Sequence, residues 1–205
     1  MTRFLLSLLL ATAPESPSPE AALAHSASLY NDGSAHAADF VQIYTPAGFA
    51  TSRRESGVVW IQRPQRLRFE YSAPEKKTFT YGDGEGRFYS PADRQLDVKK
   101  LSPEEQARLP IVFLKDPAEL AREYSLSAEA GPDGGRRIGL VPRTPRPELA
   151  RLDLGLSSNG EIRELSYSDD AGNRTEFRFE RWRSEKPRPA ADYRVEGPKG
   201  TRVVE

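Results

Sequence analysis

The sequence has no cysteine among its 205 residues. That absence excludes disulfide bonds, thiolate zinc sites, catalytic thiols and a lipid-modified N-terminal cysteine. An excess of either charge is also lacking, because 30 basic and 30 acidic residues give a formal net charge of +0. A neutral chain has no overall field with which to hold a polyanion, so we expect no nucleic-acid partner. A chain of this length and composition must fold by packing its side chains alone.

Residues suited to catalysis or metal binding are scarce. The two histidines, His25 and His36, are eleven positions apart without a partner at metal-ligand spacing, so we expect two exposed histidines and no metal site. The glycine-rich run at 82–86 precedes no Gly-Lys-Ser/Thr and no helix, which indicates a hairpin turn and not a phosphate loop. No Gly-x-Ser-x-Gly elbow occurs, and Glu alternating with Arg is typical of strand surfaces. Nothing in the sequence indicates an enzyme or a cofactor.

The N-terminus carries one short apolar run, over residues 4–13. It ends in the small-residue pattern Ala11-Thr12-Ala13 and is too short to span a bilayer, which predicts a secretory signal peptide over residues 1–13. A second small-residue pattern places an alternative cleavage site as late as residue 24. The remaining residues, 14–205, are predicted to form a single domain that works outside the cytoplasm.

Beyond this segment, short strands alternate with turn residues at a spacing of about ten. This pattern is typical of an antiparallel sandwich or barrel. Runs such as Glu161–Tyr167 and Thr175–Glu180 alternate apolar with charged side chains, which gives the sheet one apolar and one solvated face. The predicted strands are 38–45, 50–62, 66–72, 77–82, 86–90, 94–99, 123–129, 135–141, 149–156, 161–168, 174–182 and a last one near 193–196.

Three segments interrupt the strand pattern with helix-start signals. Ser18, Ser102 and Asp116 each precede a proline, and the latter two are followed by the glutamate of a capping box. The first helix is predicted to run to about Asp32, the second to break near Pro110, and the third to be short. The predicted architecture is therefore a many-stranded antiparallel sheet with helices in an N-terminal and a central position.

The stretch Val58–Tyr71, VVWIQRPQRLRFEY, places apolar residues at alternate positions around an Arg-Pro pair. Because side chains of one parity share a face of a strand, these residues are predicted to face the core together: Val59, Ile61, Leu67, Phe69 and Tyr71. Arg63 has the same parity. An arginine on the apolar side of a sheet is costly unless other groups accept its hydrogen bonds, so Arg63 requires a specific partner.

The segment Leu109–Lys115, LPIVFLK, is almost entirely hydrophobic and lies between two predicted helix starts. One interpretation is a helical segment that fills the core. The other is a lid whose apolar side covers a cavity and can be lifted from it, formed by Leu109, Ile111, Val112, Phe113 and Leu114. The periodicity of the residues alone favours the core-filling segment.

Several motifs in a fixed order connect this sequence with a known family. Asp39-Phe40-Val41-Gln42 begins a strand, the next strand contains Gly57, Trp60 and Arg63-Pro64, and an Asp83-Gly84 hairpin leads to Phe88-Tyr89-Ser90-Pro91. In this order, together with LPIVFLKDP and the ending DYRVEGPKGTRVVE, the chain from about residue 38 to 205 resembles the periplasmic outer-membrane lipoprotein carrier family, LolA.

The resemblance implies an unclosed, half-barrel antiparallel sheet of about eleven strands covered by a lid of about three short helices. It implies a monomeric periplasmic carrier that holds the acyl chains of lipoproteins in a hydrophobic cavity. Its partners would be an acylated lipoprotein, an inner-membrane lipoprotein-releasing ABC transporter and an outer-membrane acceptor. In the family the arginine before proline bonds backbone carbonyls of the lid, so Arg63 would be a latch that reaches carbonyls near Leu114, Lys115 and the N-terminal helix.

Two alternatives to the lipoprotein carrier remain open at this stage. The same fold can serve as a regulatory domain that senses lipids or misfolded proteins, although no attached second domain is visible in the sequence. It can also carry another apolar cargo, such as a glycolipid, and the sequence does not separate this cargo from acyl chains.

Overall fold

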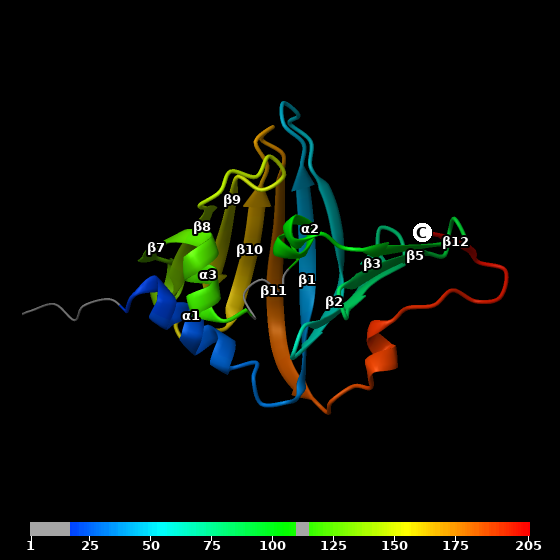
Figure 1. Cartoon of the computed structure of the whole chain (residues 1–205), viewed down its shortest axis with the longest axis horizontal. Helices are drawn as coiled ribbons and strands as arrows, with labels where there is room; N and C mark the ends of the chain where they lie inside the picture. The colour runs from blue at the N-terminus through cyan, green and yellow to red at the C-terminus, as the bar shows by residue number, and fades with distance from the viewer. Residues whose placement is uncertain (1–16, 110–114) are drawn as a thin grey trace, which may run out of the picture.

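The structure is a computed structural model of the whole chain, and it describes residues 17–109 and 115–205. Within these residues twelve strands form one sheet in the order β12-β6-β5-β4-β3-β2-β1-β11-β10-β9-β8-β7. The two edge strands, β12 and β7, lie far apart and do not pair, so the sheet is unclosed (Figure 1). The strands are β1 (Ala35–Thr45), β2 (Arg53–Gln62), β3 (Arg66–Ala73), β4 (Lys77–Gly82), β5 (Glu85–Ser90), β6 (Gln95–Lys100), β7 (Tyr124–Ala130), β8 (Arg136–Pro142), β9 (Arg151–Leu156), β10 (Ile162–Ser168), β11 (Arg174–Glu185) and β12 (Arg202–Val204).

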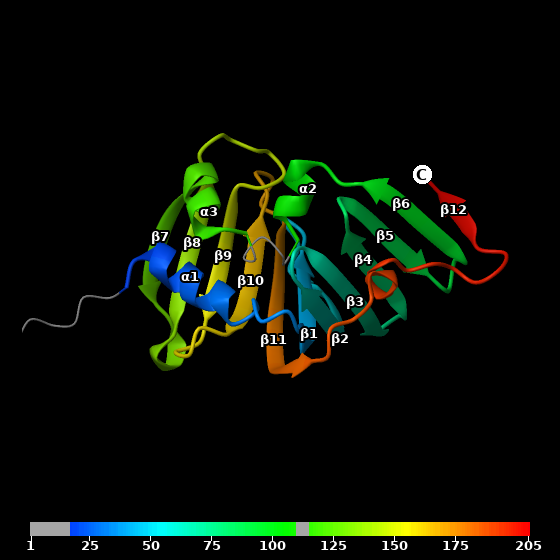
Figure 2. The same ribbon diagram turned by 60° about the horizontal axis from the view of Figure 1, so that its bottom comes forward.

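Tight turns and one bulge give the sheet its form. Asp83 and Gly84, with φ values of 53° and 79°, supply the left-handed turn between β4 and β5 that the sequence predicts. In the centre, the pairing of β1 with β11 shifts register between Ala37 and Asp39, and Arg181 opposite has φ 55°. An extra residue of this kind bends a strand and increases its twist. The bulge therefore lies where the two halves of the sheet, β2–β6 and β7–β10, turn toward each other (Figure 2).

Three α-helices are described on the concave, inner side of the sheet: α1 (Pro19–Ser28), α2 (Pro103–Ala107) and α3 (Pro117–Glu123). α1 and α3 contact each other and cover the β7–β9 part, whereas α2 lies nearer to β11 and β1 (Figure 2). All three begin at the predicted caps, and Ser102 and Glu105 form the complete capping box. At α3 the box is not formed, because Asp116 binds the N–H of Ala118 and Glu119 instead lies 3.7 Å from Lys115.

The C-terminal segment takes a different course from the predicted one. After β11 the chain crosses the outer face of β3 and β4 through the 3₁₀ helix η3 (Ala190–Tyr193), and β12 then pairs in parallel with β6. The predicted strand near 193–196 is therefore wrong. The twelfth strand lies instead at Arg202–Val204, whereas the family resemblance implies about eleven strands. Tyr193 and Val195 are buried as an alternating strand would have them, but they pack on the outer face of the sheet.

Two further boundaries differ from the sequence-based expectations. α1 ends at Ser28, not at about Asp32, and the chain turns at Gly33, where φ is 81°. β1 begins at Ala35 and so includes His36, which lies before the predicted start at residue 38. The connection between the helix and the sheet therefore runs over residues 29–34, and the Tyr30 ring on it lies 5.2 Å from the His36 ring at the start of β1, measured between centroids.

Candidate functional site

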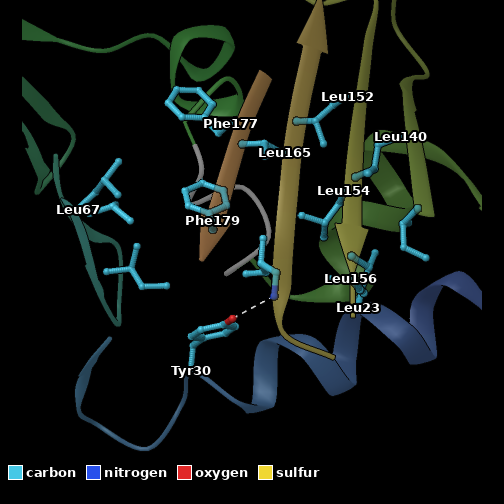
Figure 3. Close-up of a cluster of buried hydrophobic side chains, with 14 of the residues drawn as sticks. Leu23, Tyr30, Leu67, Leu140, Leu152, Leu154, Leu156, Leu165, Phe177 and Phe179 are labelled. Carbon is cyan, nitrogen blue, oxygen red and sulfur yellow. Dashed lines mark hydrogen bonds between the residues drawn. The ribbon is translucent and has the colours of Figure 1, made fainter. Parts of the chain in front are cut away.

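The inner face of the sheet carries one continuous cluster of buried apolar side chains. The cluster draws on both halves of the sheet and on two helices, whose side chains point toward each other (Figure 3). Its buried members are Ala22, Leu23, Tyr30, Ala38, Phe40, Val59, Ile61, Leu67, Phe69, Tyr81, Leu120, Tyr124, Ile138, Leu140, Leu149, Leu152, Leu154, Leu156, Ile162, Leu165, Phe177 and Phe179. We call this set the inner cluster.

The predicted face of the Val58–Tyr71 stretch is part of this cluster. Val59, Ile61, Leu67 and Phe69 are buried, and Tyr71 is half-buried and packed against them. They share a face because the chain reverses at residues 63–65, so that Val59 lies opposite Phe69 and Ile61 opposite Leu67. The stretch is thus a hairpin of two strands, and the register of the pair produces the common face.

The chemistry of the inner cluster changes across the sheet. On β8, β9 and β10 it is aliphatic, with Leu140, Leu154 and Leu165 as typical members. Around β1, β3 and β11 it is aromatic, and the Phe40 ring lies 4.8 Å from that of Phe69 in an edge-to-face arrangement. Such pairs add about 0.5 to 1.5 kcal/mol beyond the burial of their surface.

The aromatic part ends in a polar layer. The Tyr71 hydroxyl donates to Oε1 of Gln42 at 2.6 Å, and the Lys77 ammonium lies 4.6 Å from the Tyr71 ring centroid and 2.5 Å from Oε1 of Glu55. Burial, with a smaller contribution from Glu55, raises the pKa of Tyr71 above its usual value. The inner face therefore carries a half-buried ion pair beside an aromatic hydroxyl where its apolar part stops.

The helices hold to the inner face through a few specific contacts. Leu23 of α1 and Leu120 of α3 are each buried in the inner cluster, and the Tyr30 hydroxyl after α1 accepts a bond from the Ile162 N–H at 3.1 Å. Burial raises the pKa of Tyr30, so this hydroxyl stays protonated. On the other side, Oε1 of Gln106 accepts a bond from the Tyr81 hydroxyl at 2.9 Å.

The predicted lid residues are only partly described. Leu109 is half-buried and packs against the inner cluster. The other four predicted members, Ile111, Val112, Phe113 and Leu114, lie outside the described residues. The interpretation of this segment as a lid or as a core-filling helix therefore stays a prediction.

Arg63 lies in the turn between β2 and β3 and is half-buried. Its Nε atom is fully buried, and in residues 17–109 and 115–205 no acceptor lies within hydrogen-bonding distance of it. An unsatisfied buried donor costs about 1 to 3 kcal/mol. The sequence predicts that Arg63 needs a hydrogen-bond acceptor, and in the described residues its Nε has none.

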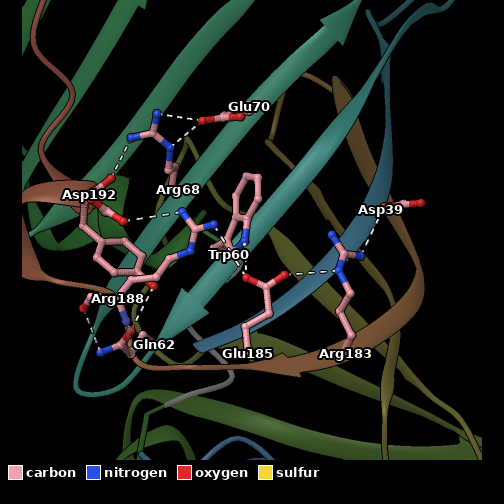
Figure 4. A network of polar contacts seen from close by, with 10 residues as sticks. Asp39, Trp60, Gln62, Arg68, Glu70, Arg183, Glu185, Arg188 and Asp192 are labelled. Carbon is pink, nitrogen blue, oxygen red and sulfur yellow. Dashed lines mark hydrogen bonds and ion pairs between the residues drawn. The ribbon is translucent and has the colours of Figure 1, made fainter. Parts of the chain in front are cut away.

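The outer face of β1–β5 carries a second, smaller site that the sequence analysis missed. Trp60, whose neighbours Val59 and Ile61 face inward, points outward and packs with Ala37 and Tyr193. Its indole N–H donates to Glu185 at 3.1 Å, and the Arg188 guanidinium lies 4.4 Å from its ring centroid (Figure 4). These contacts attach the C-terminal segment to the sheet.

Backbone groups of the same segment bond side chains of the outer face. The Gln62 amide bonds the N–H and the carbonyl of Arg188, and Arg68 donates to the Asp192 carbonyl at 2.6 Å (Figure 4). Thr80 accepts from the Val195 N–H at 3.1 Å. Because Gln62 of β2, Arg68 of β3 and Thr80 of β4 all bond this segment, it holds the three strands together from outside.

The two histidines lie in different places and bond different partners. His36 is only 7% exposed, which corrects the expectation of an exposed side chain, and its Nε2 lies 3.0 Å from Oδ1 of Asp32. His25 bonds the Asn159 carbonyl at 3.1 Å on another side of α1. Across residues 17–109 and 115–205, no three His, Asp or Glu side chains are grouped as metal ligands would be.

Comparison with known proteins identifies the family. The sequence profile of the "Outer membrane lipoprotein carrier protein LolA" family matches residues 33–195. The chain is a member of the LolA family. It is 29% identical over 167 residues to an outer-membrane lipoprotein carrier protein of Xanthomonas campestris, which covers 80% of this chain and 79% of the relative. A carrier protein of Dechloromonas aromatica is 26% identical over 168 residues, covering 82% and 79%.

The fold has a counterpart among solved structures. An uncharacterised conserved protein from Thermus thermophilus superposes with a TM-score of 0.54 over 89% of this chain and 96% of the other, at 14% sequence identity. At that identity the likeness concerns the fold alone. None of the described helices is both long and apolar enough to span a membrane.

The motif of Gly57, Trp60 and Arg63 serves both faces of the sheet. At Gly57 no side chain fits, since a Cβ atom there would lie 1.9 Å from the Glu70 carbonyl oxygen of β3. Trp60 faces outward to the C-terminal segment, and Arg63 follows at the turn. The motif therefore fixes the hairpin that separates the inner cluster from the outer attachment.

Most of the inner cluster was not among the predicted site residues. Leu152, Leu154 and Leu156, like Phe177 and Phe179, lie at alternate positions of strands that the sequence predicts correctly. Their alternation was the available signal, because it marks one apolar face per strand. Which of these faces meet in space depends on pairings between distant strands that the local pattern does not contain.

Proposed function

We propose that this protein is a periplasmic carrier that binds the acyl chains of lipoproteins and moves them from the inner to the outer membrane. The observation that carries the proposal is the continuous apolar inner face, which within residues 17–109 and 115–205 is covered by three short helices. A sheet twelve strands wide that is covered in this way can expose a large apolar surface without losing its backbone pairing. Acyl chains would take the place of the helices and cover the apolar inner face.

The energetics require a closed empty state. Burial of one methylene is worth about 0.8 kcal/mol, so three acyl chains with roughly 45 methylenes would release on the order of 36 kcal/mol. Reversible affinities do not exceed about 18 to 21 kcal/mol. Packing of the empty protein's own helices on the inner cluster offsets part of this release, and the carrier can then pass its cargo to a stronger acceptor.

Arg63 is the proposed latch of the closed state. Its Nε is buried and has no acceptor in the described residues, which supports the idea that another segment supplies one. We propose that the acceptors are backbone carbonyls near Leu114, Lys115 and α1. Hydrogen bonds of a charged donor to these carbonyls would contribute about 1 to 3 kcal/mol to closure. That is enough to favour an empty closed carrier and too little to prevent loading.

The remaining features of the proposal come from the family. An inner-membrane lipoprotein-releasing ABC transporter would load the carrier, and an outer-membrane acceptor would unload it. The protein would act without catalysis or a cofactor, as a monomer exported by its signal peptide. Residues 1–16, which include the predicted signal peptide over 1–13, lie outside the described residues.

Native mass spectrometry tests the proposal. The mature protein would be purified from a bacterial periplasm and sprayed intact, and the apolar material bound to it would be extracted and identified. A complex with acylated lipoprotein would support the carrier function. A free glycolipid would assign another cargo, and a protein that is empty and ignores added lipopeptide would contradict a carrier role.

A substitution separates the two interpretations of the segment around Pro110. If Phe113 belongs to a lid, Phe113→Glu should weaken lipopeptide binding and leave the far-ultraviolet circular dichroism unchanged. If the segment fills the core, the same change should lower the midpoint of urea unfolding. Leu29→Glu, at the exposed position directly after α1, provides a control for the added charge.

A further inference from the structure

The connection between β1 and β2 ends in an exposed aromatic side chain. Residues 46–52 join the two strands, and Phe49 within them is 67% exposed. Pro46, Ala47 and Ala50 are the neighbouring apolar residues. Figure 1 shows this connection at the top of the view, beside the turn between β10 and β11, which Ala47 contacts through a 3.0 Å bond from its N–H to Asn173. We call residues 46–52 the apolar tip.

The stem below the tip is basic. No Asp or Glu occurs between Asp39 and Glu55, whereas Arg53 and Arg54 directly follow the tip. Both arginines are exposed, and no ion pair involves either one in residues 17–109 and 115–205. Arg53 instead lies 5.3 Å from the Tyr44 ring centroid. Two positive charges are thus left without an acidic partner next to the most exposed aromatic ring of the described chain.

The neighbouring turn adds little opposing charge. The Asp169 carboxylate accepts bonds from the Asn173 N–H and side-chain amide at 2.9 and 2.8 Å, which hold it within its own turn. Asp170 is exposed, and the Arg174 guanidinium at the end of the same turn is already paired, because it lies 3.8 Å from Glu164 and 3.6 Å from Glu176. Arg53 and Arg54 therefore carry the positive charge beside the tip that no carboxylate of residues 17–109 and 115–205 pairs with.

An isolated exposed apolar residue is ordinary in proteins and needs no explanation. The tip differs from the other exposed large apolar residues of the described chain, because those are aliphatic and lie on strands or at a helix end: Leu29, Val141, Val203 and Val204. Only Phe49 combines an aromatic ring, a turn and adjacent unpaired arginines. This combination suits the boundary between lipid headgroups and acyl chains, where an aromatic ring inserts and arginines contact phosphates.

We propose that the apolar tip is a membrane-contact site that inserts Phe49 into a bilayer containing anionic phospholipid, with Arg53 and Arg54 on the headgroups. The interaction is weak and reversible, since one ring and two charges do not anchor a protein. It would bring a carrier to a membrane surface for the moment of transfer. The inference goes beyond the proposed carrier function and does not depend on it, because it is tested on empty protein and vesicles.

A tryptophan at the tip reports insertion directly. Phe49→Trp would be mixed with vesicles of phosphatidylcholine and phosphatidylglycerol whose acyl chains carry bromine, which quenches tryptophan by contact. We expect quenching and a blue shift of the added fluorescence, after subtraction of the signal of the unsubstituted protein with Trp60 and Trp182. Val203→Trp, on the distant edge strand β12, should show neither effect. Absence of quenching of Trp at position 49 with every vesicle composition would overturn the proposal.

Vesicle sedimentation measures the separate contributions. Phe49→Ser should lower the partition coefficient about tenfold, and each of Arg53→Gln and Arg54→Gln about fivefold on anionic vesicles. Val203→Ser and Arg137→Gln are the matched controls for an exposed apolar and an exposed basic residue elsewhere. Equal binding to neutral and anionic vesicles would overturn the role of the arginines. Undiminished binding of Phe49→Ser would overturn the role of the ring.

Discussion

The two halves of the sheet are covered on opposite faces. In the β7–β10 half, α1 and α3 pack on an aliphatic inner face, and the outer face carries charged side chains such as Arg137 and Glu164. In the β2–β6 half the C-terminal segment covers the outer face, and the inner face is largely aromatic. In this half the described helix contact is the bond between Tyr81 of β4 and Gln106 of α2. Because the C-terminal segment fastens the β2–β6 half from outside, we expect this half to keep its fold when its inner face is uncovered.

The first prediction removes a helix contact from the β7–β10 half. Leu23→Ala deletes a buried α1 side chain and should lower the free energy of unfolding by about 2 to 5 kcal/mol, measured by urea denaturation. Hydrogen exchange should accelerate most in β7–β9, and less in β2–β5, which the C-terminal segment holds. Leu29→Ala, on the exposed side of the same helix end, should change stability by less than about 0.5 kcal/mol. Equal acceleration in both halves would refute the contrast drawn above.

The second prediction concerns the hairpin in the other half. Gly57→Ala would bring a methyl group against the Glu70 carbonyl, and the resulting shift of β3 should cost about 1 to 3 kcal/mol. Gly82→Ala is the matched control, because its added methyl would lie 3.7 Å from its nearest neighbour and its φ is not positive. Urea midpoints measured on both variants check the difference. Equal midpoints would mean that the two strands separate without cost, and the β2–β6 half would then be less firmly fixed than described.

The third prediction weakens the outer attachment. Tyr193→Phe removes the bond from this hydroxyl to Gln62 at 3.2 Å and should cost about 1 kcal/mol at neutral pH. Burial raises the pKa of Tyr193 to about 12, compared with an ordinary value of 10. The unfolded chain therefore releases this proton first, and the stability from Tyr193 is complete below pH 10 and is lost as the pH rises through 12. The variant should lose less stability than the original protein between pH 10 and 12.

Thermal unfolding at pH 7, 10 and 11.5 checks this dependence. Tyr30 and Tyr71 also have pKa values raised by burial, so a reduced slope and not a flat profile is expected from the single substitution. Tyr44→Phe, for a tyrosine near the exposed tip, is a suitable control for loss of a phenol. An unchanged slope in Tyr193→Phe would show that this hydroxyl is not buried by the C-terminal segment.

The strands of the sheet and the C-terminal segment also differ in how well the sequence predicts their position. In β10 and β11 each strand has one apolar face, and Leu165, Phe177 and Phe179 lie on the buried side as their alternation predicts. Tyr193 and Val195 alternate in the same way, yet they belong to a segment that crosses the outer face. The alternation predicts that both side chains are buried, but it does not predict which surface they pack against. Their position depends on Trp60 and Thr80, which lie more than 100 residues away.

The surroundings of Arg63 are also predicted only in part from the sequence. The apolar residues around Arg63 follow from strand parity and hairpin register, which are local properties. The acceptor of Arg63 is not local, because a turn between two strands does not determine which distant carbonyl approaches it. His36 was expected to be exposed for a different reason: the sequence placed it before the first strand, whereas β1 begins at Ala35 and His36 is buried beside Tyr30 and Asp32.

The last prediction should leave the fold intact and have a selective effect on function. Arg63→Leu removes a side chain whose buried Nε has no acceptor in residues 17–109 and 115–205, so the protein should stay folded, and the free energy of unfolding of the empty protein should fall by no more than the latch bonds would contribute to the closed state. If Arg63 stabilises a closed empty state by about 1 to 3 kcal/mol, its loss should slow lipopeptide release to acceptor vesicles roughly fivefold to a hundredfold, while loading stays intact. Arg137→Leu, on the outer face of the β7–β10 half, controls for the lost charge. Unchanged release would assign Arg63 to the turn alone, and a large loss of stability would mean that the aromatic half depends on its inner cover as much as the aliphatic half does.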